Sequence, residues 1–146
     1  MIRYAKGDAT APEGSGPRAI VHVCNNLGAW GAGFVLAISK RWAEPERAYR
    51  RANPTMGAVQ LVNVEPGLMI VNMVAQHGFP SLSRRCALDY EALTECLHKV
   101  AAFCEAHRAS VHMPRIGCGI AGGEWARVEA IILDTLGDID VTVYDL

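Results

Sequence analysis

The sequence predicts an α/β fold in which a mixed, mostly parallel sheet lies between helices in a three-layer α/β/α arrangement. Segments with the apolar composition of strands and segments with helical periodicity follow one another in the order β-β-α-α-β-β-α-β-α-β. The later alternation of strand and helix is typical of parallel crossovers, whereas the two successive N-terminal strands are expected to pair with each other, which makes the sheet mixed. A length of 146 residues suits one domain, so we expect residues 1–146 to form a single unit.

Four strands and two helices are predicted in the first half of the chain. The strand segments are rich in Val and Ile and end at turns that contain glycine or proline. They are expected at Ile2–Lys6, Ala19–Cys24, Val59–Val64 and Leu68–Ala75. A helix that carries Val35 and Ile38 on one face is predicted between the second and third strands. A short helix over Glu44–Ala52 follows it, because Pro45 suits a first helical turn.

The second half of the chain contains two predicted helices and two predicted strands. Asp89 is a suitable N-cap for a long helix that ends at His107 and carries an apolar stripe with steps of three and four residues. A last helix is predicted from Trp125 to Gly137, because glycine commonly ends a helix. The two strands are expected at Ser110–Met113 and Val141–Tyr144.

Composition and charge exclude several classes of protein. The formal net charge of −1 provides no basic field, so we expect no nucleic-acid partner, and no apolar run reaches the length of a membrane span. The N-terminus lacks a signal peptide, and the five cysteines are scattered without a C-x-x-C motif, so we expect reduced thiols in a cytoplasmic, monomeric protein. His22 and Cys24 would share a strand face, but no metal-site cluster accompanies them, so neither a metal nor a cofactor is expected.

Two glycine-rich loops stand between a strand and a helix, at residues 25–34 and 114–123. Such loops leave backbone N–H groups free near a helix start, and these groups bind anions, above all phosphates. Gly117, Gly119 and Gly122 match the dinucleotide motif G-x-G-x-x-G, but only one further strand fits before the C-terminus, which excludes a Rossmann fold. Either loop alone is also explained as a tight turn, whereas two such loops at carboxyl ends of strands favour one shared anion-binding crevice.

Asp8 follows the first predicted strand and has two possible roles. A carboxylate there accepts hydrogen bonds from an exocyclic amine, so it suits recognition of an adenine whose diphosphate lies between the two loops. The structural alternative is an Asp that caps a turn, which is the more common situation.

Three segments of the chain resemble macrodomains. They are Gly7-Asp8, Gly31-Ala32-Gly33-Phe34 and Pro114-Arg115-Ile116-Gly117-Cys118-Gly119 before a Trp-bearing helix. The resemblance covers nearly the whole chain and is greatest to the branch of terminal ADP-ribose glycohydrolases that act on ADP-ribosylated acidic side chains. It implies the three-layer macrodomain fold and ADP-ribose, free or attached to proteins, as the ligand.

The resemblance also implies roles for individual residues. Asp8 would contact the adenine with the Ala9 amide beside it, Tyr144 would lie near the same base, and Asn25 would face the ribose distal to adenine. The first phosphate loop would comprise Trp30, Gly31, Ala32, Gly33 and Phe34. The second would comprise Ile116, Gly117, Cys118, Gly119, Ile120 and Ala121.

Two departures from the branch bear on mechanism. Some members carry a nucleophilic lysine at the position of Gln76 and an aspartate at the position of Ala121. Glutamine cannot form the covalent adduct that a lysine forms with an opened ribose. The resemblance therefore implies either a hydrolase that works without a lysine nucleophile or a reader that only binds ADP-ribose.

Candidate catalytic residues of such a hydrolase lie mostly in the polar loop over Gln76–Leu88, which is long for a connection in a compact domain. They are Asn25, Gln76, His77, Arg84 and Arg85. Each loop residue has a structural alternative, as a solvated or packing side chain. A third hypothesis is a thiol enzyme that uses Cys118, whose pKa a helix N-terminus would lower.

Overall fold

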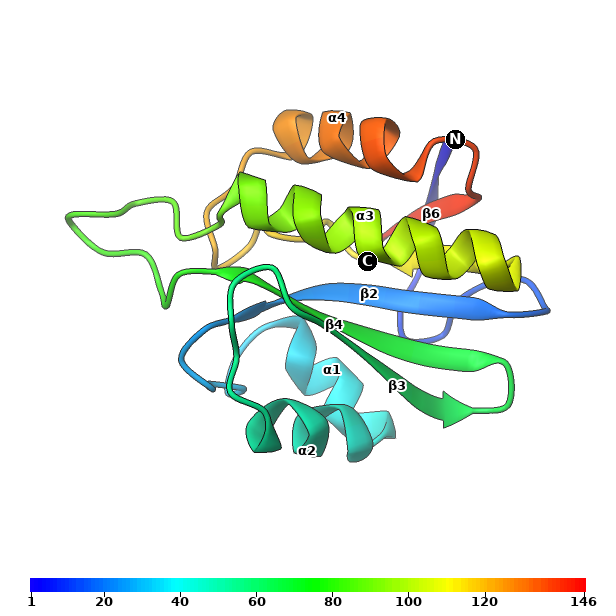
Figure 1. Cartoon of the computed structure of the whole chain (residues 1–146), viewed down its shortest axis with the longest axis horizontal. Helices are drawn as coiled ribbons and strands as arrows, with labels where there is room; N and C mark the ends of the chain where they lie inside the picture. The colour runs from blue at the N-terminus through cyan, green and yellow to red at the C-terminus, as the bar shows by residue number, and fades with distance from the viewer.

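A six-stranded mixed sheet forms the middle layer of the molecule in a computed structural model that describes all 146 residues (Figure 1). The strand order is β1-β6-β5-β2-β4-β3, and every neighbouring pair is parallel except β3 with β4. The strands are β1 (Ile2–Lys6), β2 (Arg18–Asn25), β3 (Val59–Glu65), β4 (Leu68–Gln76), β5 (Ser110–Met113) and β6 (Val141–Asp145). This is the predicted mixed, mostly parallel sheet.

The expected pairing of the first two strands is wrong. β1 lies at the edge of the sheet and pairs in parallel with β6, whereas β2 lies in the centre between β5 and β4. β1 is largely exposed and β2 is almost entirely buried, so the hydrophobic effect places the second strand centrally. The sheet is mixed for another reason, namely the antiparallel hairpin of β3 and β4.

Helices cover both faces of the sheet, as predicted (Figure 1). They are α1 (Phe34–Arg41), α2 (Glu44–Arg51), α3 (Tyr90–His107) and α4 (Trp125–Leu136). All four expected helices form, and Asp89 caps α3 as expected by accepting a hydrogen bond from the Ala92 amide at 3.0 Å. No helix has both the length and the apolar character needed to cross a membrane.

Alternate residues of the central strands supply two separate hydrophobic cores. The larger core packs α3 and α4 on residues such as Val21, Val71 and Val111, and it contains Cys96 and Cys104. The smaller core, under α1 and α2, consists of Ile20, Cys24, Trp30, Val35, Ile38, Trp42, Tyr49, Leu68 and Ile70. Because successive side chains of a strand point to opposite faces of the sheet, one apolar strand contributes residues to both cores.

The segment between β4 and α3 projects far from the body of the molecule, at the left of Figure 1. An isolated antiparallel bridge between Gln76 and Leu88 closes its base. At its tip, hydrogen bonds between the backbones of Ser81 and Arg84 form a tight turn. This projecting loop, residues 77–88, is therefore fixed at both its base and its tip.

Candidate functional site

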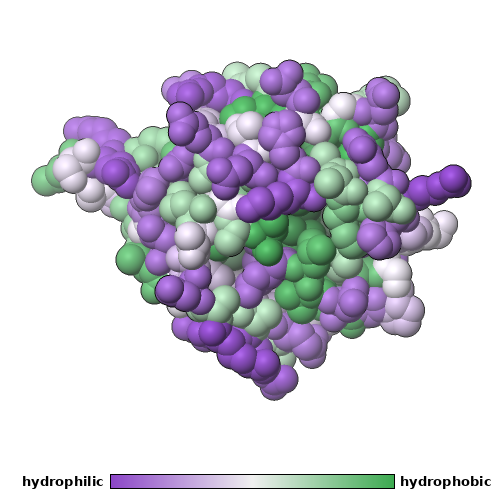
Figure 2. Space-filling model, viewed as in Figure 1, coloured by the Kyte–Doolittle hydropathy of each residue, from purple (hydrophilic) through white to green (hydrophobic).

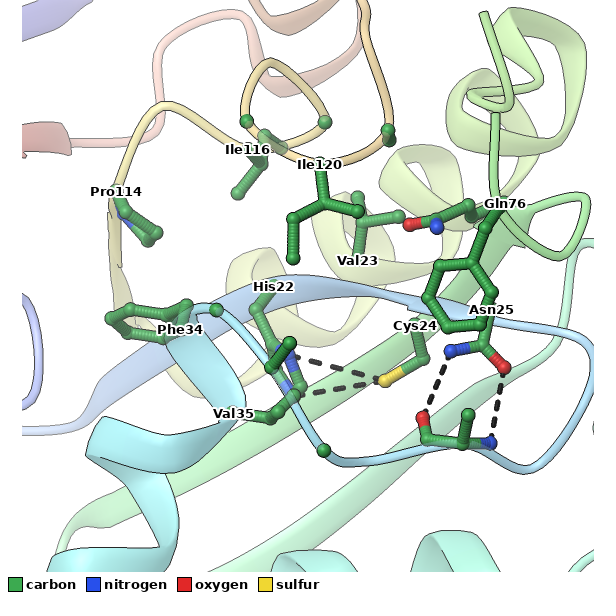
Figure 3. A pocket seen from close by; sticks show the side chains of 18 of the residues that line it. His22, Val23, Cys24, Asn25, Phe34, Val35, Gln76, Pro114, Ile116 and Ile120 are labelled. Carbon is green, nitrogen blue, oxygen red and sulfur yellow. Dashed lines mark hydrogen bonds between the residues drawn. The ribbon is translucent and has the colours of Figure 1, made fainter. Parts of the chain in front are cut away.

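A cleft of about 310 Å³ opens at the carboxyl ends of β2, β4 and β5 (Figure 3). Both glycine loops line it, as the sequence predicted. Six residues of the first loop and seven of the second contribute, together with side chains from the strand ends. The lining residues are His22, Val23, Cys24, Asn25, Ala29, Gly31, Ala32, Gly33, Phe34, Val35, Gln76, Phe79, Pro114, Arg115, Ile116, Gly117, Gly119, Ile120 and Ala121.

The side chain of Asn25 organises the first loop. Its Oδ1 accepts hydrogen bonds from the amides of Leu27 and Ala29 at 2.9 and 3.2 Å and from the Tyr49 hydroxyl at 2.9 Å. Its Nδ2 donates to the Ala29 carbonyl at 2.8 Å, which Figure 3 shows. Asn25 lines the cleft, but both ends of its side-chain amide form hydrogen bonds within the protein. Its main role is therefore to fix the conformation of the first loop.

The glycines of the second loop have different structural roles. A Cβ atom at Gly117, where φ is +72°, would lie 2.7 Å from the Leu88 side chain, and one at Gly123 would lie 2.6 Å from the Gly117 carbonyl oxygen. Both glycines are therefore required for packing. A Cβ at Gly119 would meet nothing within 4 Å, so that position faces open space.

Seven backbone amides of the two loops donate no hydrogen bond within the protein. They belong to Gly31, Ala32, Gly33, Gly117, Gly119, Ile120 and Ala121. Six of these residues are exposed or half-buried, and all seven line the cleft. Free N–H groups that converge on a cleft form an anion-binding concavity.

Apolar side chains bring the two loops together over the cleft. A Cβ at Gly33 would lie 3.3 Å from Cδ1 of Ile120, so the second loop reaches across to the first. Phe34 and Val35 lie on one side of the cleft, with Ile116 and Ile120 opposite them (Figure 3). The walls that flank the free amides are therefore largely apolar, and an apolar surrounding strengthens hydrogen bonds from amides to an anion.

No carboxylate lines the cleft, and the titratable groups at its floor are uncharged near neutral pH. Burial lowers the pKa of His22 to about 4, although a hydrogen bond to Asn72 at 2.6 Å opposes the shift. Burial also raises the pKa of the Cys24 thiol. Arg115 is the cleft's one cationic residue, and its guanidinium is paired with Asp145 at 2.8 and 3.0 Å. Backbone amides are therefore the main source of attraction for an anion.

Gln76 lines the cleft, and only one end of its side-chain amide, the nitrogen, forms a hydrogen bond within the protein. Its Nε2 donates to the Gly78 carbonyl at 2.6 Å. Its Oε1 accepts no hydrogen bond from the protein and is not sealed from solvent. This oxygen is therefore able to accept a hydrogen bond from a water molecule in the cleft.

Several predicted ligand-binding residues lie outside the cleft lining: Asp8, Ala9, Trp30, Cys118 and Tyr144. Trp30 is buried beneath its loop and donates to Ser39 at 2.7 Å, and Tyr144 is buried with its hydroxyl 2.7 Å from Nδ1 of His112. Asp8 forms the turn that was its structural alternative, because Oδ1 accepts from both the amide and the hydroxyl of Thr10 at 2.8 and 2.7 Å.

The thiol-enzyme hypothesis requires a helix N-terminus at Cys118, and the structure places none there. Helix α4 begins at Trp125, well beyond Cys118, and Cys118 is half-buried in the loop. Burial raises the pKa of this thiol, and the positive charge of Arg115 opposes the shift only in part. A thiol with a raised pKa is mostly protonated at neutral pH and is a poor nucleophile.

The three candidate catalytic residues of the projecting loop also lie outside the cleft lining. His77 is 2.7 Å from the Asp89 carboxylate, so it pairs with the N-cap of α3 instead of facing the cleft. Arg84 and Arg85 are exposed near the tip of the loop. The structural alternative therefore describes His77, and the two arginines lie on the surface of the projecting loop, outside the cleft lining.

Sequence reasoning missed some lining residues, namely His22, Val23, Cys24, Ala29, Val35, Phe79, Pro114 and Arg115. Most of them adjoin predicted residues, so a search of the strand ends next to each glycine loop would have found them. Phe79 is different, because nothing in its local pattern separates it from other residues of a polar loop. No group of three or more His, Cys, Asp or Glu side chains is arranged to hold a metal ion.

Solved structures match the chain over its whole length, whereas no family model matches it. A protein of unknown function from Bacteroides thetaiotaomicron is 52% identical, with a TM-score of 0.96 and coverage of 100% of this chain and 98% of that chain. A macrodomain protein from Streptomyces coelicolor is 48% identical, with a TM-score of 0.88 and coverage of 100% and 99%.

Curated proteins with known names match at lower identity. Mouse chromodomain-helicase-DNA-binding protein 1-like is 30% identical over 98% of this chain, which spans only 17% of the mouse protein. An ADP-ribose 1''-phosphate phosphatase from Saccharomyces cerevisiae is 26% identical, with coverage of 99% of this chain and 98% of that protein. A DNA ADP-ribosyl glycohydrolase from Mycobacterium tuberculosis is 26% identical over 99% of this chain and 42% of that protein.

Proposed function

This chain belongs to the macrodomain family, and on that premise we propose that its cleft binds ADP-ribose and hydrolyses it from modified acidic side chains of proteins. The relatives named for phosphatase and glycohydrolase activities support hydrolysis in general. The acidic side chain as the attachment point is the more specific part of the proposal. It rests on the resemblance to glycohydrolases that act on such linkages.

The single observation that carries the proposal is the set of seven free amides around one cleft. A diphosphate needs donors on two sides, and the two glycine loops supply them from opposite walls. No lysine lines the cleft and its one arginine is paired with Asp145, so backbone dipoles rather than charged side chains bind the phosphates. Only a ligand with adjacent phosphates makes use of both loops.

The adenine end of the ligand is assigned to Asp8. Both hydrogen bonds of the Asx turn go to Oδ1, which leaves Oδ2 available to an exocyclic amine. Arg41 of α1 donates to the Thr10 hydroxyl at 2.9 Å and so ties this turn to the helix that follows the first loop. The turn therefore holds the carboxylate in place for the base.

Hydrolysis requires a water molecule near the distal ribose and support for the developing charge. We assign the water to the unpaired Oε1 of Gln76, which accepts one of its hydrogen bonds. Attack of the water oxygen at the anomeric carbon forms the new C–O bond and breaks the bond to the substrate oxygen. The side-chain carboxylate leaves with the bonding electrons, and the proton that the attacking water loses passes to solvent. Free amides of the second loop stabilise negative charge that develops in this step.

A covalent lysine mechanism does not suit this cleft. The chain has three lysines, Lys6, Lys40 and Lys99, and none of them lines the cleft. Lys99 lies on α3 and donates to the Gly57 carbonyl at 2.7 Å. The proposed reaction therefore proceeds without an intermediate attached to the protein.

A second candidate function is a reader that binds ADP-ribose without cleaving it. The specific observation in its favour is the absence of any Asp or Glu from the cleft lining, because such a site offers no general base. The labile ester at an anomeric carbon needs little catalysis, which is why we favour hydrolysis.

A time course of ADP-ribose release separates the two functions. The substrates are glutamate-linked, serine-linked and DNA-linked ADP-ribose, and borohydride is added in parallel to trap any lysine adduct. We expect release from the glutamate-linked substrate and no trapped protein, whereas the serine acetal resists because its leaving group is poorer. Tight binding with no release from any substrate would establish the reader. Faster release from the DNA-linked substrate would show that the preferred attachment point is on nucleic acid.

A further inference from the structure

The projecting loop stands beside the mouth of the cleft, and its two ends contact the two glycine loops. Its first residues meet the cleft, since Gln76 and Phe79 both line it. The Gly78 amide donates to Asn26 at 2.9 Å, which ties the start of the loop to the first glycine loop. Beyond this point the loop extends into solvent (Figure 1).

Two large apolar side chains are exposed at this mouth, and a third is exposed at the tip of the projecting loop. Leu82 at the loop tip is 96% exposed, Leu27 of the first glycine loop is 66% exposed, and Phe79 is 47% exposed. A Cβ at Gly78 would lie 3.2 Å from Cδ1 of Leu27, so the two loops are adjacent here. Figure 2 shows hydrophobic atoms at the end of the projecting loop beside hydrophilic ones.

Positive charge accompanies these apolar side chains. Arg84 and Arg85 are exposed on the projecting loop. Arg50 of α2 donates to the Gly28 carbonyl at 3.2 Å, next to Leu27, while its Nε pairs with Glu46 at 2.8 Å, so its charge is offset in part. No acidic residue occurs from residue 66 to residue 88. The chain as a whole has a formal net charge of −1, so this cluster is a local excess of positive charge on a slightly acidic molecule.

We propose that this surface docks the protein segment that carries the ADP-ribosyl group, and that the preferred segment bears acidic and apolar side chains. The mouth surface is defined as Leu27, Arg50, Phe79, Leu82, Arg84 and Arg85. The inference rests on the proposed function, because the modified side chain must leave the cleft at the ribose end. Arginines pair with carboxylates of the segment, and the exposed leucines cover its apolar side chains.

A protein segment fits this surface better than a nucleic acid. Backbone phosphates of a nucleic acid are bound by a continuous basic track, and bases stack on aromatic rings. Here the three arginines come from two separate segments, exposed leucines accompany them, and Phe79 is the one aromatic side chain. Exposed aliphatic side chains together with arginines are typical of a protein-binding surface.

Calorimetry with uncleavable conjugates tests the inference separately from hydrolysis. The ligands are free ADP-ribose and ADP-ribose joined through a glutamine-type amide isostere to three carriers. The first carrier is an acidic peptide with leucines, the second is the same peptide with Glu→Gln and Leu→Ser changes, and the third is an oligonucleotide. We expect the acidic conjugate to bind about tenfold more tightly than free ADP-ribose, from a few exposed ion pairs and apolar contacts.

Single substitutions assign the effect to the mouth surface. Arg84→Glu and Leu82→Ser should each weaken binding of the acidic conjugate about three- to fivefold and leave free ADP-ribose unchanged. The matched controls are Lys40→Glu at the far end of α1 and Leu133→Ser on α4, where the leucine is 52% exposed. Neither control should alter any affinity, and 0.5 M salt should reduce the Arg84 effect.

The outcomes separate this inference from the proposed function. If wild-type protein does not bind free ADP-ribose, the proposed function fails and the mouth surface fails with it. If free ADP-ribose binds normally but all conjugates bind equally, only the mouth surface is overturned. Tighter binding of the oligonucleotide conjugate than of the acidic peptide would also overturn it.

Discussion

At the scale of single residues, Asn25 shows that a polar side chain beside a glycine loop can hold the loop in shape through hydrogen bonds and not primarily contact a ligand. The sequence places an amide at the end of a strand, where a ligand contact is the natural interpretation. In the folded chain this side chain accepts hydrogen bonds from the Leu27 and Ala29 amides and the Tyr49 hydroxyl and donates one to the Ala29 carbonyl. These bonds satisfy backbone groups of the turn after β2 that have no partner in the sheet or a helix.

Asp8→Asn should weaken ADP-ribose binding by roughly 1.5–3 kcal/mol, the value of a hydrogen bond to a charged group. Asparagine keeps an oxygen for the Thr10 turn, so the loop should stay intact. Calorimetry with ADP-ribose measures the change, and Asp138→Asn on the exposed surface is the matched control. An unchanged affinity would limit Asp8 to the role of a turn residue.

Gln76→Ala should reduce turnover by no more than about a hundredfold, or roughly 2.7 kcal/mol of barrier. The substitution removes the oxygen that holds water but leaves the free amides of both loops. Single-turnover rates on the glutamate-linked substrate measure it, with ADP-ribose affinity as the control. A loss of many thousandfold would make Gln76 indispensable to the chemistry and would contradict this mechanism.

At the scale of elements, some glycines of the second loop are required for close packing, and others leave space for a ligand. Gly117 lies against the Leu88 side chain, and Gly123 lies against the Gly117 carbonyl. Neither position therefore has room for a side chain. Gly119 has no such neighbour and its amide is free. A motif of evenly spaced glycines therefore combines residues with different physical reasons.

Gly119→Glu should abolish ADP-ribose binding without unfolding the protein. The new side chain has room, because nothing lies within 4 Å of its Cβ position, but its charge would repel a phosphate held by the neighbouring amides. Gly119→Ala should bind within a few-fold of wild type. Circular dichroism and calorimetry on both variants check this, and normal binding by the folded Glu variant would reduce the loop to a turn.

The projecting loop shows why His77 is structural. The Gln76–Leu88 bridge brings the ends of the loop together, and this places His77 2.7 Å from the carboxylate of Asp89. Asp89 also caps α3, and hydrogen bonds from the Ala92 amide and then from His77 lower its pKa, against burial. The same contact therefore fixes the base of the loop and the start of the helix.

At the scale of the whole molecule, the two faces of the sheet differ in polarity. On the face of α1 and α2, β5 and β6 carry a buried polar pair, His112 and Tyr144, whose ring nitrogen and hydroxyl lie 2.7 Å apart. The segment between β1 and β2 covers them, since the Glu13 amide donates to the Tyr144 hydroxyl at 2.8 Å. Two histidines, His22 and His112, are thus buried on this face of the sheet.

Stability should fall as pH decreases from about 6.5 toward 4. Burial lowers the pKa of both His22 and His112 to about 4, and for His112 the positive charges of Arg18 and Arg3 add to the shift. The unfolded chain, with ordinary histidine pKa values near 6.5, binds more protons in this window, so acid favours unfolding by up to about 1.4 kcal/mol per pH unit for each histidine.

Urea unfolding between pH 7 and 4.5 measures this dependence. His112→Gln should reduce the slope of stability against pH by roughly half, provided that the midpoint at pH 7 shows a folded protein. Asp8 and Asp89 do not interfere, because their lowered pKa values place their titration below this window. Constant stability over the whole range would mean that neither histidine is excluded from water.

Local patterns determined the elements and the two loops. Strand and helix segments follow from the period of apolar residues, and the observed ends differ from the predicted ones by about one residue. The glycine loops were recognisable because a strand, several glycines and a helix occur in direct succession. Such features depend on neighbours in the chain, so one sequence suffices to find them.

Only the tertiary structure decided which strand lies in the centre, which amides remain free and where the side chains of the loops point. β1 lies at the edge of the sheet because the more apolar β2 lies in its centre. Trp30 and Tyr144 are buried in contacts with residues distant in sequence: the Trp30 indole donates to Ser39, and the Tyr144 hydroxyl accepts from the Glu13 amide. The exposed leucines and arginines of the mouth surface come from three separate segments. These arrangements depend on contacts between residues far apart in sequence, which no local pattern contains.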